Sequence, residues 1–150
     1  MLENILTEKA IRLKAQATDW QDAVRMGGEL LVNAGFAEPS YIEAMIETVK
    51  QLGPYSVIAP GIAMPHARPE AGVSKPGLSL VTLANPVEFG NKENDPVDIV
   101  VSFCVTDNTS HIQMLAELAQ LLGSDEAVTT VRNAKEVKEV TQLIKNFQFS

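Results

Sequence analysis

The most continuously apolar stretch of this chain covers residues 97–105, where Val, Ile, Phe and Cys dominate. A short run of this composition predicts a β-strand. A strand with one solvated face would alternate polar and apolar residues, so the continuous run indicates burial on both faces. We therefore place residues 97–105 in the middle of a sheet that helices cover on both sides.

Stretches with strand and helix periodicity alternate along the rest of the chain. Residues 10–15 alternate apolar and basic side chains, which is typical of a strand with one solvated face near a sheet edge. Other stretches repeat apolar residues at helical spacing between capping residues and Gly or Pro. Further strands are predicted at residues 55–59, 78–83 and 87–89, and helices at 20–33, 40–52, 112–122 and 124–131, followed by a last helix capped by Asn133.

These elements predict one α/β domain over residues 1–150, built as a three-layer α/β/α sandwich. We expect a mixed central sheet of about five strands with helices on both faces. The sheet is expected to be mixed because the connection at Asn85 and Pro86 is too short for a parallel crossover. With 45% hydrophobic residues, a chain of 150 residues can bury a core without disulfides or metal.

The composition limits which kinds of molecule the protein could bind and where in the cell it is expected. A net charge of −7 disfavours nucleic acid and anionic lipid and favours a basic protein partner. No run approaches the roughly 18 apolar residues of a membrane span, and no basic and apolar leader opens the chain. The single cysteine, Cys104, lies in a predicted core strand, where it is an apolar filler rather than a nucleophile. We expect a cytoplasmic protein.

One of the two histidines, His66, lies in a proline-rich loop at residues 60–69, after a predicted strand. Pro65 and Pro69 restrict the backbone on both sides, so the loop can hold a side chain in a fixed direction. Residues 62–64 would form an apolar lip, and Arg68 adds a planar cation suited to phosphate or carboxylate. The alternative is an ordinary turn with an incidental exposed histidine.

The second histidine, His111, falls in the first turn of the predicted helix after the central strand. Both histidines follow strands, so they could meet at one end of the sheet. Free N–H groups at a helix N-terminus favour an anion and a neutral imidazole. Thr109 and Ser110 could bind phosphate oxygens there, with His66 as a nucleophile that carries a transferable phosphoryl group. The alternative for His111 is a residue near the helix cap without a reaction role.

Other chemistries fit the residues less well. Two histidines and one buried cysteine fall short of a zinc site, and no Gly-x-Ser-x-Gly element indicates a serine hydrolase. Nothing in the polar loop at residues 90–96 pairs two carboxylates for hydrolysis. No glycine-rich nucleotide loop is present, so phosphate would arrive from another protein. We expect neither a cofactor nor a metal ion.

Two motifs, at residues 60–66 and 107–113, resemble the enzyme IIA domain of the phosphoenolpyruvate-dependent sugar phosphotransferase system (PTS), mannitol/fructose class. The similarity extends over nearly the whole chain. Within that class, residues 53–55, 66–70 and 94–99 are most similar to ascorbate-type components.

The resemblance implies a phosphohistidine carrier. It implies that HPr phosphorylates His66, that His66 passes the group to a cysteine of the cognate IIB component, and that IIB phosphorylates a sugar during uptake through the membrane component IIC. His111 matches the second active-site histidine of the family. Mannitol-type members carry an arginine on the helix before the loop. Lys50 falls near that position, so either Arg68 or Lys50 would make the phosphate contact here.

Several points stay open at this stage. The alternative function is a regulatory, phosphorylatable binding module of the nitrogen-PTS kind. The family suggests that Nε2 carries phosphate, but the residues do not decide between the two nitrogens. The transported sugar, and whether the protein is a monomer or a homodimer, also stay open.

Overall fold

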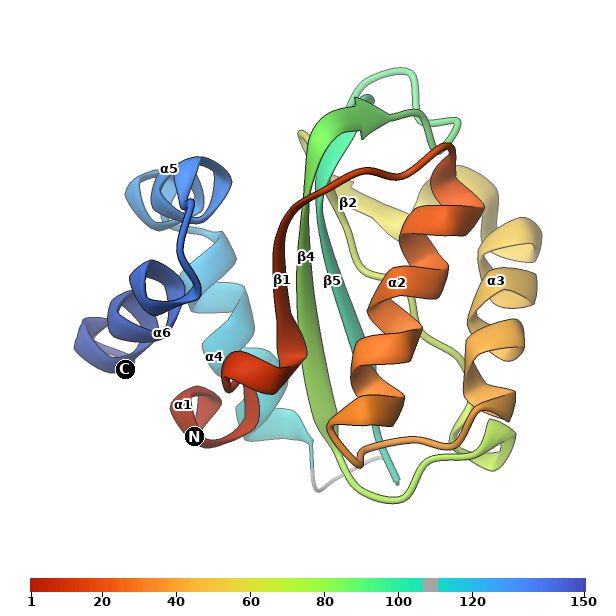
Figure 1. Cartoon of the computed structure of the whole chain (residues 1–150), viewed down its shortest axis with the longest axis horizontal. Coiled ribbons are helices and arrows are strands. Elements are labelled where there is room, and N and C mark those ends of the chain that lie inside the picture. Colours follow the sequence, from red (N-terminus) through yellow and green to blue (C-terminus); the bar gives the residue numbers. More distant parts are fainter. Residues whose placement is uncertain (107–110) are drawn as a thin grey trace.

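The computed structural model describes residues 1–106 and 111–150. In this part of the chain, a mixed five-stranded sheet forms the middle layer of the fold (Figure 1). β4 runs antiparallel to β5, β1 is parallel to β4, β3 is parallel to β5, and β2 is antiparallel to β3. The predicted α/β fold with a mixed sheet is confirmed. The strands, in their order across the sheet, are β1 (Ile11–Ala15), β4 (Gly77–Val87), β5 (Val97–Cys104), β3 (Ile62–Ala63) and β2 (Val57–Ala59).

Helices cover both faces of the sheet. In Figure 1, α2 and α3 lie on one face, and α1, α4, α5 and α6 lie on the other. No helix in the described ranges is long and apolar enough to cross a membrane. The helices are α1 (Leu2–Ile5), α2 (Trp20–Asn33), α3 (Ser40–Leu52), α4 (Ile112–Leu122), α5 (Asp125–Asn133) and α6 (Val137–Asn146), with 3-10 turns η1 (Glu8–Ala10), η2 (Gly53–Ser56) and η3 (Pro69–Ala71).

The positions of β5 and β1 in the sheet match the sequence predictions. β5 lies between β4 and β3, and its Val97, Ile99 and Val100 are fully buried, as expected for a central strand. The alternating strand β1 lies at one edge of the sheet. Two helices begin with a side-chain cap, since Asp19 accepts the N–H of Asp22 at 2.8 Å at the start of α2 and Ser124 caps α5.

The segment before His66 differs from the prediction. A buried strand was expected at residues 55–59, but only Val57–Ala59 is extended, at the sheet edge, with Ile58 50% exposed. Tyr55 belongs to the preceding 3-10 turn. Ile62 and Ala63 are not an apolar lip. They form β3, buried because the strand is inserted between β2 and β5.

Two further predictions were wrong. β4 continues through Asn85 and Pro86 to Val87, so residues 87–89 are not a separate returning strand. The proline is tolerated because these residues are exposed near the strand end, where the β4–β5 register shifts. Asn133 is the last residue of α5 and does not cap the final helix. Glu136 caps α6 instead, in a reciprocal capping box with Glu139.

The close approach of α2 to the sheet yields a stability prediction. A Cβ atom added at Gly27 would overlap the Ser102 hydroxyl and lie 3.2 Å from Ser102 Cβ. We therefore expect Gly27→Ala to lower the free energy of unfolding by about 1–3 kcal/mol, measured by urea denaturation.

Ser102→Ala provides the matched test, because the Ser102 hydroxyl has no hydrogen-bond partner in the described part of the chain. Adding Ser102→Ala to Gly27→Ala should recover much of the loss, since it removes the overlapping oxygen. A Gly27→Ala protein as stable as the wild type would contradict the prediction, as would a double variant with no recovery.

Candidate functional site

His66 lies in the segment that follows β3. This segment is at the end of the sheet where the C-termini of the parallel strands β3 and β5 lie. β3 pairs with β5 in parallel through Ile62 with Ile99 and Ala63 with Val100. The pairing continues past the strand, because the Phe103 N–H donates to the Pro65 carbonyl at 3.3 Å. The backbone directly before His66 is therefore held along β5.

Two contacts fix the imidazole of His66, which is partly buried. Its Nδ1 lies 3.1 Å from the Met64 carbonyl oxygen. Its ring stacks on Phe103, with centroids 4.4 Å apart and an interplanar angle of 21°. A carbonyl oxygen can only accept, so Nδ1 carries the proton of the neutral ring and donates it. Nε2 then keeps a free lone pair, which makes it the nucleophilic nitrogen.

His111 is the N-cap residue of α4, one position before the predicted first turn. It follows β5, and β5 is parallel to β3, so both histidines follow strand ends at the same edge of the sheet. Its Nδ1 is buried and has no hydrogen-bond partner among the residues that the structure describes. The predicted phosphate ligands Thr109 and Ser110 lie outside the described residues.

The two candidate cations differ in their distance along the chain from His66. Arg68 is exposed and precedes η3, two residues after His66 in the same loop. Lys50 is exposed on the last turn of α3. Neither side chain forms an ion pair with a residue in the described ranges, so both charges are available to an anion.

An apolar groove of about 360 Å³ is lined in part by two residues that contact His66. Met64 and Phe103, which both contact His66, line one part of it, and Ile58 of β2 lines another. The contact of Phe103 with His66 could not be predicted from the sequence, because the position of Phe103 in an apolar strand indicates only a core residue. The groove is completed by Ala59, Leu115, Leu118, Ala119, Leu122 and Gly123.

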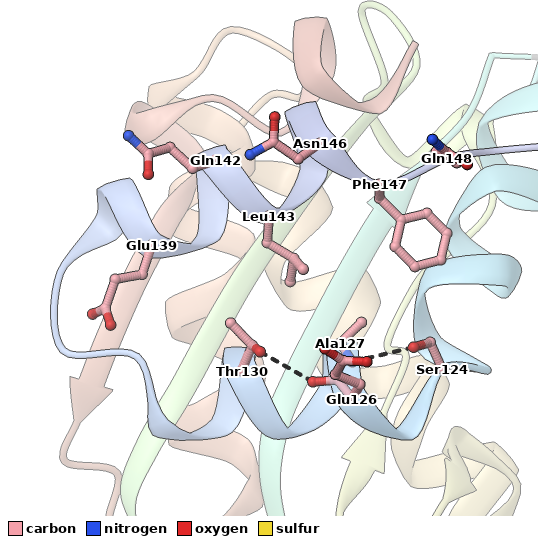
Figure 2. Close-up of a pocket in the computed structure, with 10 residues that line it drawn as sticks. All are labelled: Ser124, Glu126, Ala127, Thr130, Glu139, Gln142, Leu143, Asn146, Phe147 and Gln148. Atoms are coloured by element: carbon pink, nitrogen blue, oxygen red, sulfur yellow. Dashed lines mark hydrogen bonds between the residues drawn. The ribbon is translucent and has the colours of Figure 1, made fainter.

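Figure 2 shows a different hollow, between α5 and α6. Its polar side chains are partly engaged within α5, where Ser124 accepts the N–H of Ala127 at 3.2 Å and Thr130 donates to the Glu126 carbonyl at 3.0 Å. None of the predicted site residues lines it. This hollow is therefore separate from the candidate site.

In residues 1–106 and 111–150, no group of three or more His, Cys, Asp or Glu side chains could hold a metal ion. Burial raises the pKa of the Cys104 thiol to about 12, so the thiolate is not formed near neutral pH. Cys104 is buried, in agreement with the predicted core position.

Comparison with known proteins identifies the family to which this α/β chain belongs. Residues 4–147 match the family described as "Phosphoenolpyruvate-dependent sugar phosphotransferase system, EIIA 2". The chain belongs to this family. It is therefore a phosphotransferase that works as a phosphocarrier through a phosphohistidine intermediate.

Individual relatives agree with this assignment. The ascorbate-specific PTS system EIIA component of Escherichia coli (strain K12) is 44% identical over 143 residues, which cover 95% of this chain and 93% of the relative. The solution structure of the mannitol-specific cryptic phosphotransferase enzyme IIA CmtB from Escherichia coli superposes with a TM-score of 0.86 at 33% identity, covering 97% of this chain and 99% of that one.

A third relative was solved as a complex of enzyme IIA and phosphorylated enzyme IIB of the mannitol system from Escherichia coli. It superposes with a TM-score of 0.81 at 30% identity, covering 95% of this chain and 98% of that chain. A IIA protein of this fold therefore engages a phosphorylated IIB protein.

The geometry of His66 predicts the tautomer of its neutral ring. Because the Met64 carbonyl accepts from Nδ1, the Nδ1–H form of the neutral ring should dominate. Long-range ¹H–¹⁵N correlation spectra should show a protonated Nδ1 and an unprotonated Nε2 for His66. A dominant Nε2–H form would contradict the contact with Met64.

Proposed function

We propose that His66 Nε2 accepts a phosphoryl group from phosphorylated HPr and passes it to a cysteine of a cognate IIB component during sugar uptake through the membrane component IIC. In the first step the Nε2–P bond forms while the nitrogen–phosphorus bond of the donor histidine breaks. In the second step the cysteine thiolate attacks phosphorus, and the electron pair of the Nε2–P bond returns to the His66 ring. The protein would do this work in the cytosol.

The observation that carries the proposal is the hydrogen bond from His66 Nδ1 to the Met64 carbonyl. It leaves the Nε2 lone pair free to attack phosphorus. Positive charge builds up on the ring as the new bond forms, and the Met64 carbonyl dipole stabilises that charge. The proton on Nδ1 can stay in place during both steps. The ring is therefore prepared both to accept the phosphoryl group and to donate it.

The surroundings of His66 support protein partners rather than a small substrate. Apolar side chains line the groove, among them the exposed Ile58 and the partly buried Phe103, on which the His66 ring stacks. Apolar surface of this kind is suited to burial against another protein. The net charge of −7 favours a basic donor such as HPr.

Sequence similarity supports ascorbate as the transported sugar, because the relative named above is an ascorbate-specific component with 44% identity. The mannitol IIA–IIB complex supports a IIB acceptor. Both likenesses favour transport over the regulatory role of a nitrogen-PTS module.

The remaining site residues would support the phosphoryl group. We assign His111, at the N-terminus of α4, as a hydrogen-bonding partner of the phosphoryl oxygens. Thr109 and Ser110, which precede it in the sequence, would be further donors. Arg68 would neutralise charge on the phosphoryl group from the same loop as His66. In this assignment Lys50, on another element, is not the main phosphate contact.

Phosphorylation of single variants tests the roles of the two histidines. Incubation with phosphoenolpyruvate, enzyme I and HPr should add the mass of one phosphoryl group to the wild type and none to His66→Ala. His111→Ala should remain folded and accept the group at the same site, about 10- to 100-fold more slowly, since it loses hydrogen bonds to a charged group. Intact mass and quenched-flow labelling measure these effects.

His111→Ala is the control for His66→Ala, because it also removes an imidazole but leaves the proposed phosphoryl acceptor, His66, in place. Labelling of His66→Ala equal to that of the wild type would refute the acceptor assignment. A His111→Ala protein with wild-type kinetics would refute the supporting role alone.

Substitutions at the two cations decide which one contacts phosphate. Arg68→Ala should slow transfer by about tenfold or more, because it removes charge-assisted hydrogen bonds. Arg68→Lys should keep the charge, lose the planar fork and slow transfer less. Lys50→Ala is the matched control and should transfer at the wild-type rate. If only Lys50→Ala slows transfer, Lys50 replaces the arginine of the family.

A further inference from the structure

Tyr41 of α3 directs its buried hydroxyl at the backbone around His66. The side chain is fully buried. Its hydroxyl oxygen accepts the N–H of Ala67 at 2.9 Å. The hydroxyl donates to the Phe103 carbonyl at 2.8 Å, and the Ala67 carbonyl lies within reach at 3.2 Å. One side-chain oxygen thus connects the residue after His66 to the residue on which the His66 ring stacks.

This hydroxyl completes a frame around the imidazole. The residue before His66, Pro65, is bonded directly to Phe103 through the Phe103 N–H. The residue after it, Ala67, is bonded to Phe103 through Tyr41. Both peptide neighbours of His66 are therefore tied to the residue whose ring packs against the imidazole.

The hydroxyl stays neutral and so keeps both of its roles. Burial raises the pKa of Tyr41 above the ordinary value for tyrosine, by more than the hydrogen bond with the Ala67 backbone lowers it. A phenolate could not donate to the Phe103 carbonyl, whereas the neutral phenol donates and accepts at once.

We propose that Tyr41 is a positioning residue for phosphoryl transfer at His66, holding the backbone on both sides of the imidazole so that Nε2 points at the incoming phosphorus. Tyr41 is fully buried, so it acts through Ala67 and Phe103 without meeting either protein partner. The kinetic part of this inference rests on the function proposed above, whereas its structural part does not.

Tyr41→Phe tests the kinetic part, because it removes the hydroxyl and keeps the ring. The rate constant at saturating phosphorylated HPr should fall about tenfold, the size of one lost hydrogen bond. The KM for the donor should stay unchanged, since the buried Tyr41 leaves the docking surface intact.

Thr82→Val is the matched control. Thr82 is also buried, and its hydroxyl also accepts a backbone N–H, that of Lys14 at 2.9 Å. It pairs with Ile99 of β5, away from Phe103. Thr82→Val should lower the melting temperature and leave the transfer kinetics unchanged. Equal kinetic losses in both variants would overturn the positioning role, because they would reflect lost stability alone.

The ring tautomer is a second readout that needs no partner protein. In long-range ¹H–¹⁵N spectra, Tyr41→Phe should show a mixture of Nδ1–H and Nε2–H forms at His66, whereas Thr82→Val should keep the wild-type pattern. A Tyr41→Phe protein with wild-type kinetics and a wild-type tautomer would overturn the proposal. If phosphorylated HPr fails to label the wild type, the proposed function falls, while the tautomer still decides the structural part.

If Tyr41→Phe fails to fold, hydrogen exchange in the wild-type protein can still test the proposal. The Ala67 amide should exchange with deuterium as slowly as amides of β5, because its acceptor is a fully buried hydroxyl. Exchange at the rate of an exposed loop amide would overturn the proposal.

Discussion

The parallel pairing of β3 with β5 is the constraint on which the site depends. β3 is short, yet it is inserted between β2 and β5 and is fully buried in the sheet. The hydrogen bond from Phe103 to Pro65 extends this pairing beyond the strand to the residue next to His66. The position of His66 is thus set by the central strand of the core, although the residue itself lies in a loop.

The Met64 carbonyl, which accepts the hydrogen bond from His66 Nδ1, also suits the proposed phosphorylation of this ring. A backbone carbonyl orients the imidazole and stabilises positive charge on it, but carries no full negative charge of its own. A carboxylate in the same place would repel the dianionic phosphoryl group only a few ångströms away and would hold the protonated ring more strongly. With Met64 as acceptor, the ring is oriented without a full negative charge beside it. In the proposed function, Arg68 and the N-terminus of α4 would balance the phosphate charge.

Much of this arrangement could be predicted from local sequence. The apolar run at residues 97–105 correctly predicted the central strand, and His111 follows that strand as expected. His66 was expected directly after a strand at residues 55–59, whereas it follows β3. β3 could not be found, because two residues are too few for periodicity and their burial depends on pairing with β5. The continuation of β4 through Pro86 depends on its exposed position near the strand end, which is a tertiary property. The contacts of Phe103 and Tyr41 join distant parts of the chain, so no local pattern contains them.

A carrier that serves a donor and an acceptor in turn has to present one nitrogen to two different proteins. A loop that became ordered only on docking would pay its ordering entropy in each encounter. In this protein the loop around His66 is held by contacts within the free chain. Phe103 packs on one face of the ring, and hydrogen bonds of Tyr41 and Pro65 connect the flanking backbone to β5. The Tyr41 side chain that ties this backbone is therefore buried, whereas Arg68 and Ile58 of the apolar groove are exposed. This division allows the partners to differ in their surface contacts while the reacting nitrogen keeps one position.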